Sequence, residues 1–149
     1  MSFIEEKLNS VDKLNYVVYL HDNKVGNDWT NTWGTEISGA HANAGNCWVS
    51  FNDRIEREGE TVYNGNIGWS LKDVMEIEVA PLEHVLRGKN AKLGHPGWTA
   101  RVEPPIFVVR VQLKGVTGEA NLADEVLANR VAAALNHAVE LYGGRKEPF

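Results

Sequence analysis

Apolar residues recur every three or four positions near the end of the chain, between Asn121 and Tyr142. This spacing lines one side of an α-helix and predicts a long amphipathic helix. The apolar positions of the stripe are Leu122, Val126, Leu127, Val131, Ala134, Leu135, Ala138, Val139 and Tyr142. Asn121 is the expected N-cap and Gly143-Gly144 the expected stop. Because such a helix gains most of its stability by burying its apolar side, we expect it to pack on a sheet.

Shorter segments upstream alternate between apolar and other residues with a period of two, which is typical of β-strands. The expected strands are 14–21, 47–55, 61–63, 67–71, 74–80 and 106–114. Asn64-Gly65 lies between two of them and predicts a two-residue hairpin turn, because Asn and Gly tolerate positive φ. In the last strand, Ile106 and Val108 share a face with polar residues, so part of that face is expected to be uncovered.

The segments between these strands differ in length and composition. Residues 2–10 predict a short helix, since Ser2 and Glu5 have capping-box spacing. Residues 22–46 are rich in Asn, Gly and Thr and predict a long loop, which in a compact domain is often functional. The alternative for part of this segment is a short hairpin, because Trp33, Thr35 and Ile37 alternate. Residues 81–88 predict a helical turn that ends at Gly88, and residues 89–103 a second loop. Residues 115–119 are expected to turn directly into the final helix.

Most of the connections between strands are too short for the crossovers that parallel strands require. The sequence therefore predicts an α+β fold with a strongly twisted antiparallel sheet or partly open barrel. A short N-terminal helix precedes the sheet, and the long C-terminal helix packs on it. A chain of 149 residues fits one globular domain, spanning 1–149.

The second half of the chain resembles a pleckstrin-homology-like domain. The resemblance lies in the segment Ile67–Val79, the strand Phe107–Val111 and the terminal amphipathic helix. The short N-terminal helix is similar to the one that precedes the first strand in some bacterial members. The resemblance implies a partly open barrel of seven strands capped by the C-terminal helix. Families with this fold mostly bind lipids, peptides or proteins and rarely catalyse, so a binding role is an expectation from fold analogy.

Composition narrows the classes of partner. The chain has 15 Lys and Arg against 20 Asp and Glu, a net charge of −5, which argues against a nucleic-acid surface. No apolar run is long enough to span a bilayer, and the first residues lack the features of a signal peptide. With a single cysteine, the chain is expected to be soluble and cytoplasmic.

Cys47 is the one candidate nucleophile. The sequence Gly45-Asn46-Cys47-Trp48 resembles the surroundings of the nucleophile in papain-like and transglutaminase-like hydrolases. His95 and Asp124 follow in the Cys–His–Asp order, which would give a hydrolase or acyl transferase. The alternative is a small buried cysteine, and it is favoured because the segment after Cys47 reads as a strand rather than a helix. The five histidines lack metal-ligand spacing, so no metal or cofactor is expected.

Aromatic residues in the two expected loops are the candidate ligand contacts. They are Trp29, Trp33, His41 and Trp98. Large rings beside neutral polar groups suit a protein, peptide or small-molecule ligand. The favoured interpretation is therefore a non-catalytic binding domain that makes contact through its Trp-rich loops. The alternatives are the Cys47–His95 enzyme and a subunit of a homo-oligomer that pairs through Ile106 and Val108.

Overall fold

The computed structural model describes residues 1–142, and these residues form three α-helices, one 3-10 turn and eight strands. The α-helices are α1 (Ser2–Asn9), α2 (Leu82–Lys92) and α3 (Glu125–Tyr142). The strands are β1 (Leu14–Asp22), β2 (Asp28–Asn43), β3 (Trp48–Arg57), β4 (Glu60–Ser70), β5 (Val74–Pro81), β6 (Trp98–Glu103), β7 (Phe107–Leu113) and β8 (Val116–Leu122). The 3-10 turn η1 (Leu71–Asp73) joins β4 to β5. The predicted α+β class is confirmed, with a short N-terminal and a long C-terminal helix; the expected stop at Gly143-Gly144 lies outside the described residues.

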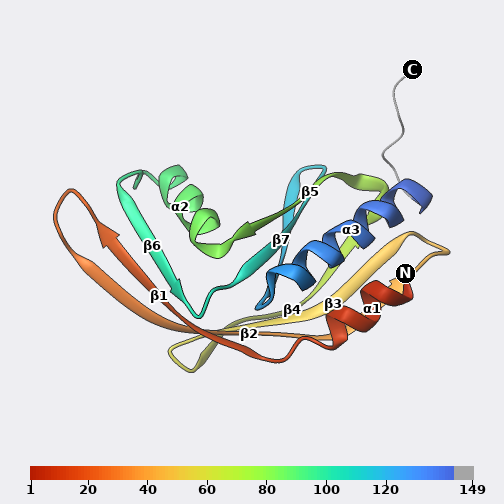
Figure 1. Cartoon of the computed structure of the whole chain (residues 1–149), viewed down its shortest axis with the longest axis horizontal. Helices are drawn as coiled ribbons and strands as arrows, with labels where there is room; N and C mark the ends of the chain where they lie inside the picture. The colour runs from red at the N-terminus through yellow and green to blue at the C-terminus, as the bar shows by residue number, and fades with distance from the viewer. Residues whose placement is uncertain (143–149) are drawn as a thin grey trace, which may run out of the picture.

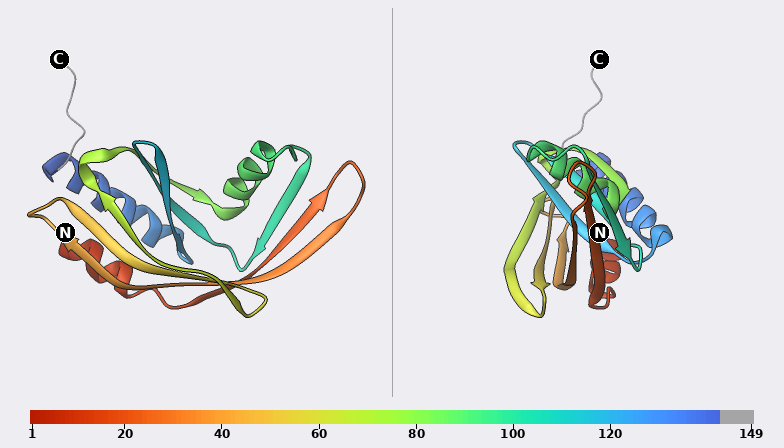
Figure 2. Two further views of the ribbon diagram at one scale, coloured as in Figure 1. Left: turned by 180° about the vertical axis from the view of Figure 1, so that it is seen from behind. Right: turned by 90° about the vertical axis from the view of Figure 1, so that its left-hand side faces the viewer.

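The strands make two antiparallel sheets of unequal size. The large sheet has the order β4-β3-β2-β1-β6, and the small sheet has the order β5-β7-β8. Figure 1 shows the large sheet as a long curved floor, with the small sheet standing over its concave face. Helix α2 lies on one side of the small sheet and α3 on the other, and Figure 2 shows the same layers from behind.

The small sheet divides the interior into two hydrophobic clusters. The larger cluster joins α1, α3 and the small sheet to strands β2, β3 and β4 of the large sheet. Its largest fully buried side chains are Trp69 and Phe51. The smaller cluster joins α2 to β1, β6 and β7 through Tyr16, Val85 and Val108. Ile106 and Val108 are 2% and 0% exposed, so the face expected to be uncovered is buried. An oligomer interface through these two residues is therefore wrong, because α2 and the large sheet cover them.

The final helix begins later than its apolar pattern predicts. Asp124 is the N-cap, and its carboxylate accepts hydrogen bonds from the backbone N–H of Val126 at 2.8 Å and of Leu127 at 3.3 Å. Asn121 instead belongs to β8, where it pairs with Val108 of β7. Residues 116–122 were expected to be a turn and the start of the helix. They form a strand because Gly118, Ala120 and Leu122 alternate inward with a period of two.

The expected loop at 22–46 is mostly strand β2, the longest in the molecule as described. Its alternation is hidden for two reasons. Residues 28–32 are covered on neither face, so they carry no apolar period. Farther along, the register with β3 shifts between Ser38 and His41, where Gly39 has a φ of 60°. A bulge of this kind changes the face on which later residues point.

The hairpin turn between β3 and β4 is Glu58-Gly59, whereas Asn64-Gly65 lies inside β4. Both Glu58 and Gly59 have positive φ, at 51° and 81°, as a two-residue turn of this type requires. Glu58 is held there by Thr32, since its N–H donates to the Thr32 carbonyl at 2.9 Å and its carboxylate accepts the Thr32 N–H at 2.6 Å. These contacts offset the unfavourable backbone conformation of a glutamate in the turn.

The expected helical turn at 81–88 continues through Gly88 to Lys92, so α2 is a full helix. The expected loop at 89–103 contains the end of this helix and the strand β6, which pairs with β1. Within β6 only Ala100 and Val102 are buried. The alternation of apolar and polar residues is therefore too short to be recognised as a strand in the sequence. Glu83 of α2 accepts the outward N–H of Val102 at 2.8 Å and thereby ties the helix to this edge.

Candidate functional site

Three strands of the large sheet extend beyond the body of the molecule. The β1–β2 hairpin and β6 continue past β3, which ends at Arg57 opposite Trp33. We call this end the sheet tip and define it as residues 20–31 with residues 93–101. The turn between β1 and β2 and the turn between α2 and β6 meet there, and Asn23 N–H donates to the Gly97 carbonyl at 3.3 Å. Figure 1 shows the sheet tip at the left end of the curved sheet.

The sheet tip carries a cluster of three aromatic rings. The ring centroids of Trp29 and Trp98 are 4.9 Å apart with an interplanar angle of 31°, and those of His95 and Trp98 are 4.0 Å apart at 14°. The strand register produces this meeting, because Leu20 pairs with Trp29 and Asp22 pairs with Trp98, so both indoles point from the same face. Trp29 and Trp98, two of the four predicted contact residues from separate expected loops, therefore lie in one cluster.

Asp22 lies beside the aromatic cluster and stabilises the hairpin turn next to it. Its carboxylate accepts the backbone N–H of Lys24 at 2.9 Å, which is the main reason why the pKa of Asp22 is lowered. The indole N–H of Trp98, the backbone N–H of Val25 and the nearby His95 lower this pKa further. The carboxylate that caps the hairpin turn thus also lies beside Trp98 and His95.

The opposite face of the sheet tip is polar and hollowed. An open depression of about 460 Å³ is lined by Tyr19, His21, Asp28, Thr30, Thr99 and Arg101, together with Leu20, Trp29 and Ala100. His21 Nδ1 lies 2.6 Å from Asp28 Oδ1, and the Arg101 guanidinium lies 4.3 Å from the centroid of the Tyr19 ring. Arg101 also pairs with Glu103. The polar side chains on this face therefore contact one another, His21 with Asp28 and Arg101 with Glu103.

The other two predicted contact residues lie elsewhere. Trp33 packs beside the smaller cluster, with the Arg57 guanidinium 5.9 Å from its ring centroid. His41 is far along β2, where its Nδ1 is 3.5 Å from a carboxylate oxygen of Glu5 in α1. The structure therefore brings together Trp29 and Trp98 of the four predicted residues, and adds His95 to them.

Cys47 and His95 are not brought together. Cys47 is buried in the turn between β2 and β3, where its thiol donates to the backbone carbonyl of Tyr142 at the end of α3. The turn with Cys47 and the turn with His95 lie at opposite ends of the molecule (Figure 1). The third member of the proposed triad, Asp124, is occupied as the N-cap of α3. No nucleophile–base pair is formed from these residues.

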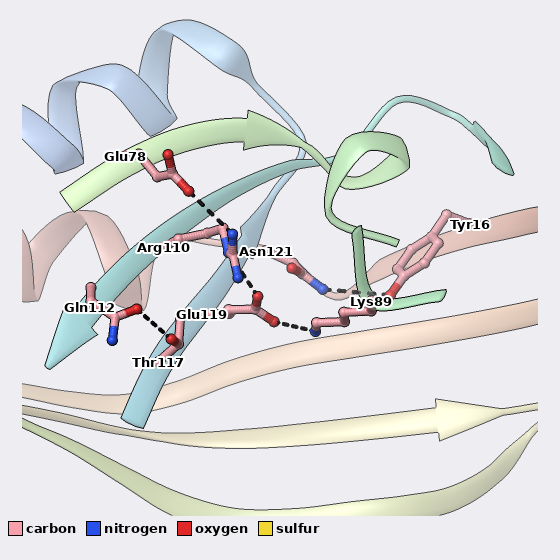
Figure 3. A network of polar contacts seen from close by, with 8 residues as sticks. All are labelled: Tyr16, Glu78, Lys89, Arg110, Gln112, Thr117, Glu119 and Asn121. Carbon is pink, nitrogen blue, oxygen red and sulfur yellow. Dashed lines mark hydrogen bonds and ion pairs between the residues drawn. The ribbon is translucent and has the colours of Figure 1, made fainter. Parts of the chain in front are cut away.

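A charged network lies on the side of the small sheet that faces α2 (Figure 3). Arg110 of β7 donates to Glu78 at 3.2 Å and to Glu119 at 3.1 Å, and Lys89 of α2 donates to Glu119 at 2.7 Å. Each charge in the network meets an opposite charge, and the network ties α2 to the small sheet. This role is structural, and the network leaves no unmatched group for a ligand.

A second hollow lies between the two sheets, and sequence reasoning missed it. It has a volume of about 340 Å³ and runs between β4 and β8, with Asp53 of β3 in its wall. A signal was present in the sequence: Val49, Phe51, Asp53 and Ile55 occupy successive positions on one face of a strand, and three of the four are apolar. An acidic residue at an inward position is the exception that marks a site.

Comparison with protein-family models, with curated proteins and with solved structures finds no match to this chain. Among residues 1–142, no group of three or more His, Cys, Asp or Glu side chains is arranged to hold a metal ion. The same residues include no helix with the length and apolar character needed to cross a membrane.

Proposed function

We propose that this chain is a non-catalytic binding domain whose sheet tip docks a protein or peptide partner. The observation that carries the proposal is the aromatic cluster of Trp29, His95 and Trp98 at the exposed end of the sheet. Two apolar side chains of the adjoining turns add to it, since Val25 is 66% exposed and Leu93 is 74% exposed. Exposed apolar groups gathered at one end of a folded chain are typical of an interaction surface.

The cluster is suited to binding because it is already ordered. Trp29 is 38% exposed, yet its ring lies against Trp98, and the ring of Trp98 is stacked on His95. A partner that covers these rings gains apolar contact area without having to order flexible side chains first. Tryptophan is also among the residues that most often dominate binding energy at interfaces.

The chemistry favours a protein or peptide over a small flat ligand. The rings of Trp29, Trp98 and His95 already contact one another, which leaves no slot between them for a ligand ring. The neighbouring depression on the other face has its charges internally paired, as His21 with Asp28 and Arg101 with Glu103. A projecting apolar end is better matched by a hydrophobic groove or pocket of a macromolecule.

The order of elements also supports a binding role. The terminal helix after the last strand is the feature that agrees with the resemblance to pleckstrin-homology-like domains, whereas the described residues form eight strands, with α2 and β6 as additions, instead of the seven that the resemblance implies. Families with that fold mostly bind partners and rarely catalyse. The resemblance supports the class of function and is silent about the surface used.

The test compares two tryptophan variants of the full chain. Trp29→Ala with Trp98→Ala removes the cluster, whereas Trp48→Ala removes a tryptophan that is 41% exposed in the half of β3 remote from the sheet tip. Both variants are first checked for native circular dichroism and cooperative unfolding. Partners are captured from extract of the source cells with each protein and quantified by mass spectrometry, and binding is then measured with the purified partner.

We expect the wild type and Trp48→Ala to enrich the same partner, and the double variant to lose it, with affinity reduced by roughly a hundredfold or more. A partner retained equally by all three proteins would mean that the sheet tip is not the contact surface. A partner lost only with Trp48→Ala would move the interface to the opposite end of the large sheet.

A further inference from the structure

The hollow between the sheets is bounded by two strands that are each paired on one side only. β4 is an edge of the large sheet and β8 is an edge of the small sheet, within the part of the chain that is described. Most of the lining is apolar, supplied by Ile55, Tyr63, Ile67, Trp69, Leu113 and Val116. The hollow, which we call the inter-sheet groove, therefore offers an apolar slot that is open to solvent along one side.

Asp53 is the unmatched carboxylate in this groove, where, among the described residues, the buried indole N–H of Trp69 also has no hydrogen-bond partner. Its carboxylate is half-buried and makes no hydrogen bond or ion pair with any residue in the described range 1–142. Burial raises the pKa of Asp53 to about 6, since little around it stabilises the charged form. No Lys, Arg or His is among the residues that line the groove. A half-buried carboxylate without a partner is costly to keep, and a cation would relieve that cost.

The other titratable groups near Asp53 do not supply the missing charge. Glu119 in the same groove is engaged by Lys89 and Arg110. Tyr16 of β1 has its pKa raised to about 12, chiefly by burial and in smaller part by the charge of Asp53. Tyr63 of β4 adds a ring and a hydroxyl to the lining. The groove is thus electronegative at Asp53 and has no internal compensation there.

Tyr63 provides a second recognition element beside the carboxylate. Gly65 pairs directly with Asp53 across β3 and β4. The ring and hydroxyl of Tyr63 lie over Gly65, so close that a Cβ at position 65 would be within 3.0 Å of them. The aromatic ring therefore covers the place where a side chain opposite Asp53 would stand. A carboxylate next to an aromatic ring is a combination that attracts organic cations.

We infer that the inter-sheet groove is a binding site for an organic cation, a primary ammonium or guanidinium group carried on an apolar body. The cationic head pairs with Asp53 and lies against Tyr63, and the apolar body lies along Ile55, Ile67 and Leu113. A bare metal ion fits poorly because the groove offers one free carboxylate and apolar walls. An anion would face an unpaired carboxylate, and a neutral apolar ligand would leave Asp53 buried and unmatched.

The test uses the full chain and phenethylammonium as the probe, with 2-phenylethanol as its neutral counterpart of similar shape. Binding is followed by calorimetry and by the NMR shifts of the residues that line the groove. Asp53→Asn removes the charge while keeping the shape, and Asp12→Asn makes the same chemical change at an exposed position outside the groove. Tyr63→Leu removes the ring but keeps an apolar side chain.

We expect saturable binding of phenethylammonium at pH 7.5 with shifts at β4 and β8, and about tenfold or greater loss of affinity in Asp53→Asn. Asp12→Asn should bind as the wild type does, 2-phenylethanol should bind at least about tenfold more weakly, and Tyr63→Leu should show an intermediate loss. Wild-type affinity should also fall as the pH decreases from 7.5 to 5, because protonation removes the charge of Asp53.

Absence of saturable binding by phenethylammonium, or equal affinity of wild type and Asp53→Asn, would overturn the inference. Equal affinity for the amine and the alcohol would also overturn the inference, since it would show that the ammonium charge does not contribute to binding. The source of the cation is separated by a further arm with the peptide acetyl-Val-Lys-Val-amide, which carries the same ammonium group. Tighter binding of the peptide assigns a lysine of a protein strand; tighter binding of the free amine assigns a small molecule.

This site is remote from the aromatic cluster of the sheet tip, and the two hypotheses are tested with different residues. Loss of partner binding in the tryptophan variant leaves the inter-sheet groove unaffected, and loss of amine binding in Asp53→Asn leaves the sheet tip unaffected. Each can therefore fail without the other.

Discussion

The indole of Trp69 in β4 packs directly on the backbone of Gly118 in β8. A Cβ at position 118 would lie closer than 3.0 Å to the indole nitrogen, a separation that real side chains do not show. On its other side Trp69 meets Phe51 edge to face, with ring centroids 5.1 Å apart. The large sheet and the small sheet therefore approach each other through a tryptophan and a residue with no side chain.

Gly118→Ala should destabilise the protein because its methyl group would push Trp69 out of the larger cluster. We expect a loss of about 1–3 kcal/mol in the free energy of unfolding, measured by urea denaturation. Gly88→Ala is the matched control, since Gly88 lies inside α2 and an added Cβ would meet nothing within 4 Å. That control should be stabilised by roughly 0.5–1 kcal/mol through helix propensity. Equal effects of the two changes would show that Trp69 does not rest on Gly118.

The N-cap of α3 is Asp124 in the structure, whereas the sequence pattern predicts Asn121. Asp124→Ala removes the acceptor for the N–H groups of Val126 and Leu127 and should cost about 1 kcal/mol of unfolding free energy. Asn121→Ala removes only a 3.5 Å contact with the Tyr16 hydroxyl and should cost less. Chemical denaturation of both variants checks the order. A larger loss of unfolding free energy in Asn121→Ala than in Asp124→Ala would indicate that Asn121 is the N-cap.

What the sequence reveals depends on how completely each element is covered. Helix α3 and strand β7 are predictable because each buries a continuous face, so that the period of 3.6 or 2 is visible. Residues 28–32 of β2 are covered on neither face and look like a loop, although backbone pairing with β1 makes them a strand. Strand pairing is a long-range property that local composition does not carry.

The candidate sites also depend on long-range pairing that local sequence does not show. Trp29 and Trp98 are 69 positions apart in sequence, and only the register of β1 with both neighbouring strands brings them together. Cys47 and His95 carry a familiar residue pattern, yet the topology separates them. Asp53 was visible as an acid among inward apolar residues, but its lack of a partner depends on which side chains the fold places around it.

Asp53 should make the stability of the ligand-free protein depend on pH. Its pKa is raised by burial from 3.8 to about 6, so the folded state binds a proton more readily than the unfolded state between these values. The charged form therefore destabilises the fold above pH 6, and this penalty disappears as the pH falls toward 3.8. Asp53→Asn should be more stable than wild type at pH 7.5 by about 1 kcal/mol, a value that allows for partial exposure to solvent.

The measurement is urea denaturation of wild type and Asp53→Asn at pH 7.5, 6 and 4. We expect the advantage of the variant to shrink with decreasing pH and to vanish near pH 4, with Asp12→Asn showing no comparable trend. A variant that is less stable than wild type at pH 7.5 would mean that the Asp53 carboxylate has a favourable partner in the native state.

The environment of Cys47 predicts slow alkylation in the folded protein. The thiol is buried in the larger cluster and its hydrogen goes to the carbonyl of Tyr142, so a reagent reaches it only when the end of α3 separates from the β2–β3 turn. Labelling with iodoacetamide at pH 8 should be at least about a hundredfold slower than in the urea-unfolded chain, which serves as the reference. The rate should rise in low concentrations of urea that loosen α3 before global unfolding. Labelling that is faster in the folded chain than in the unfolded chain at pH 6 would instead indicate an exposed, activated thiolate, and the hydrolase hypothesis would regain its nucleophile.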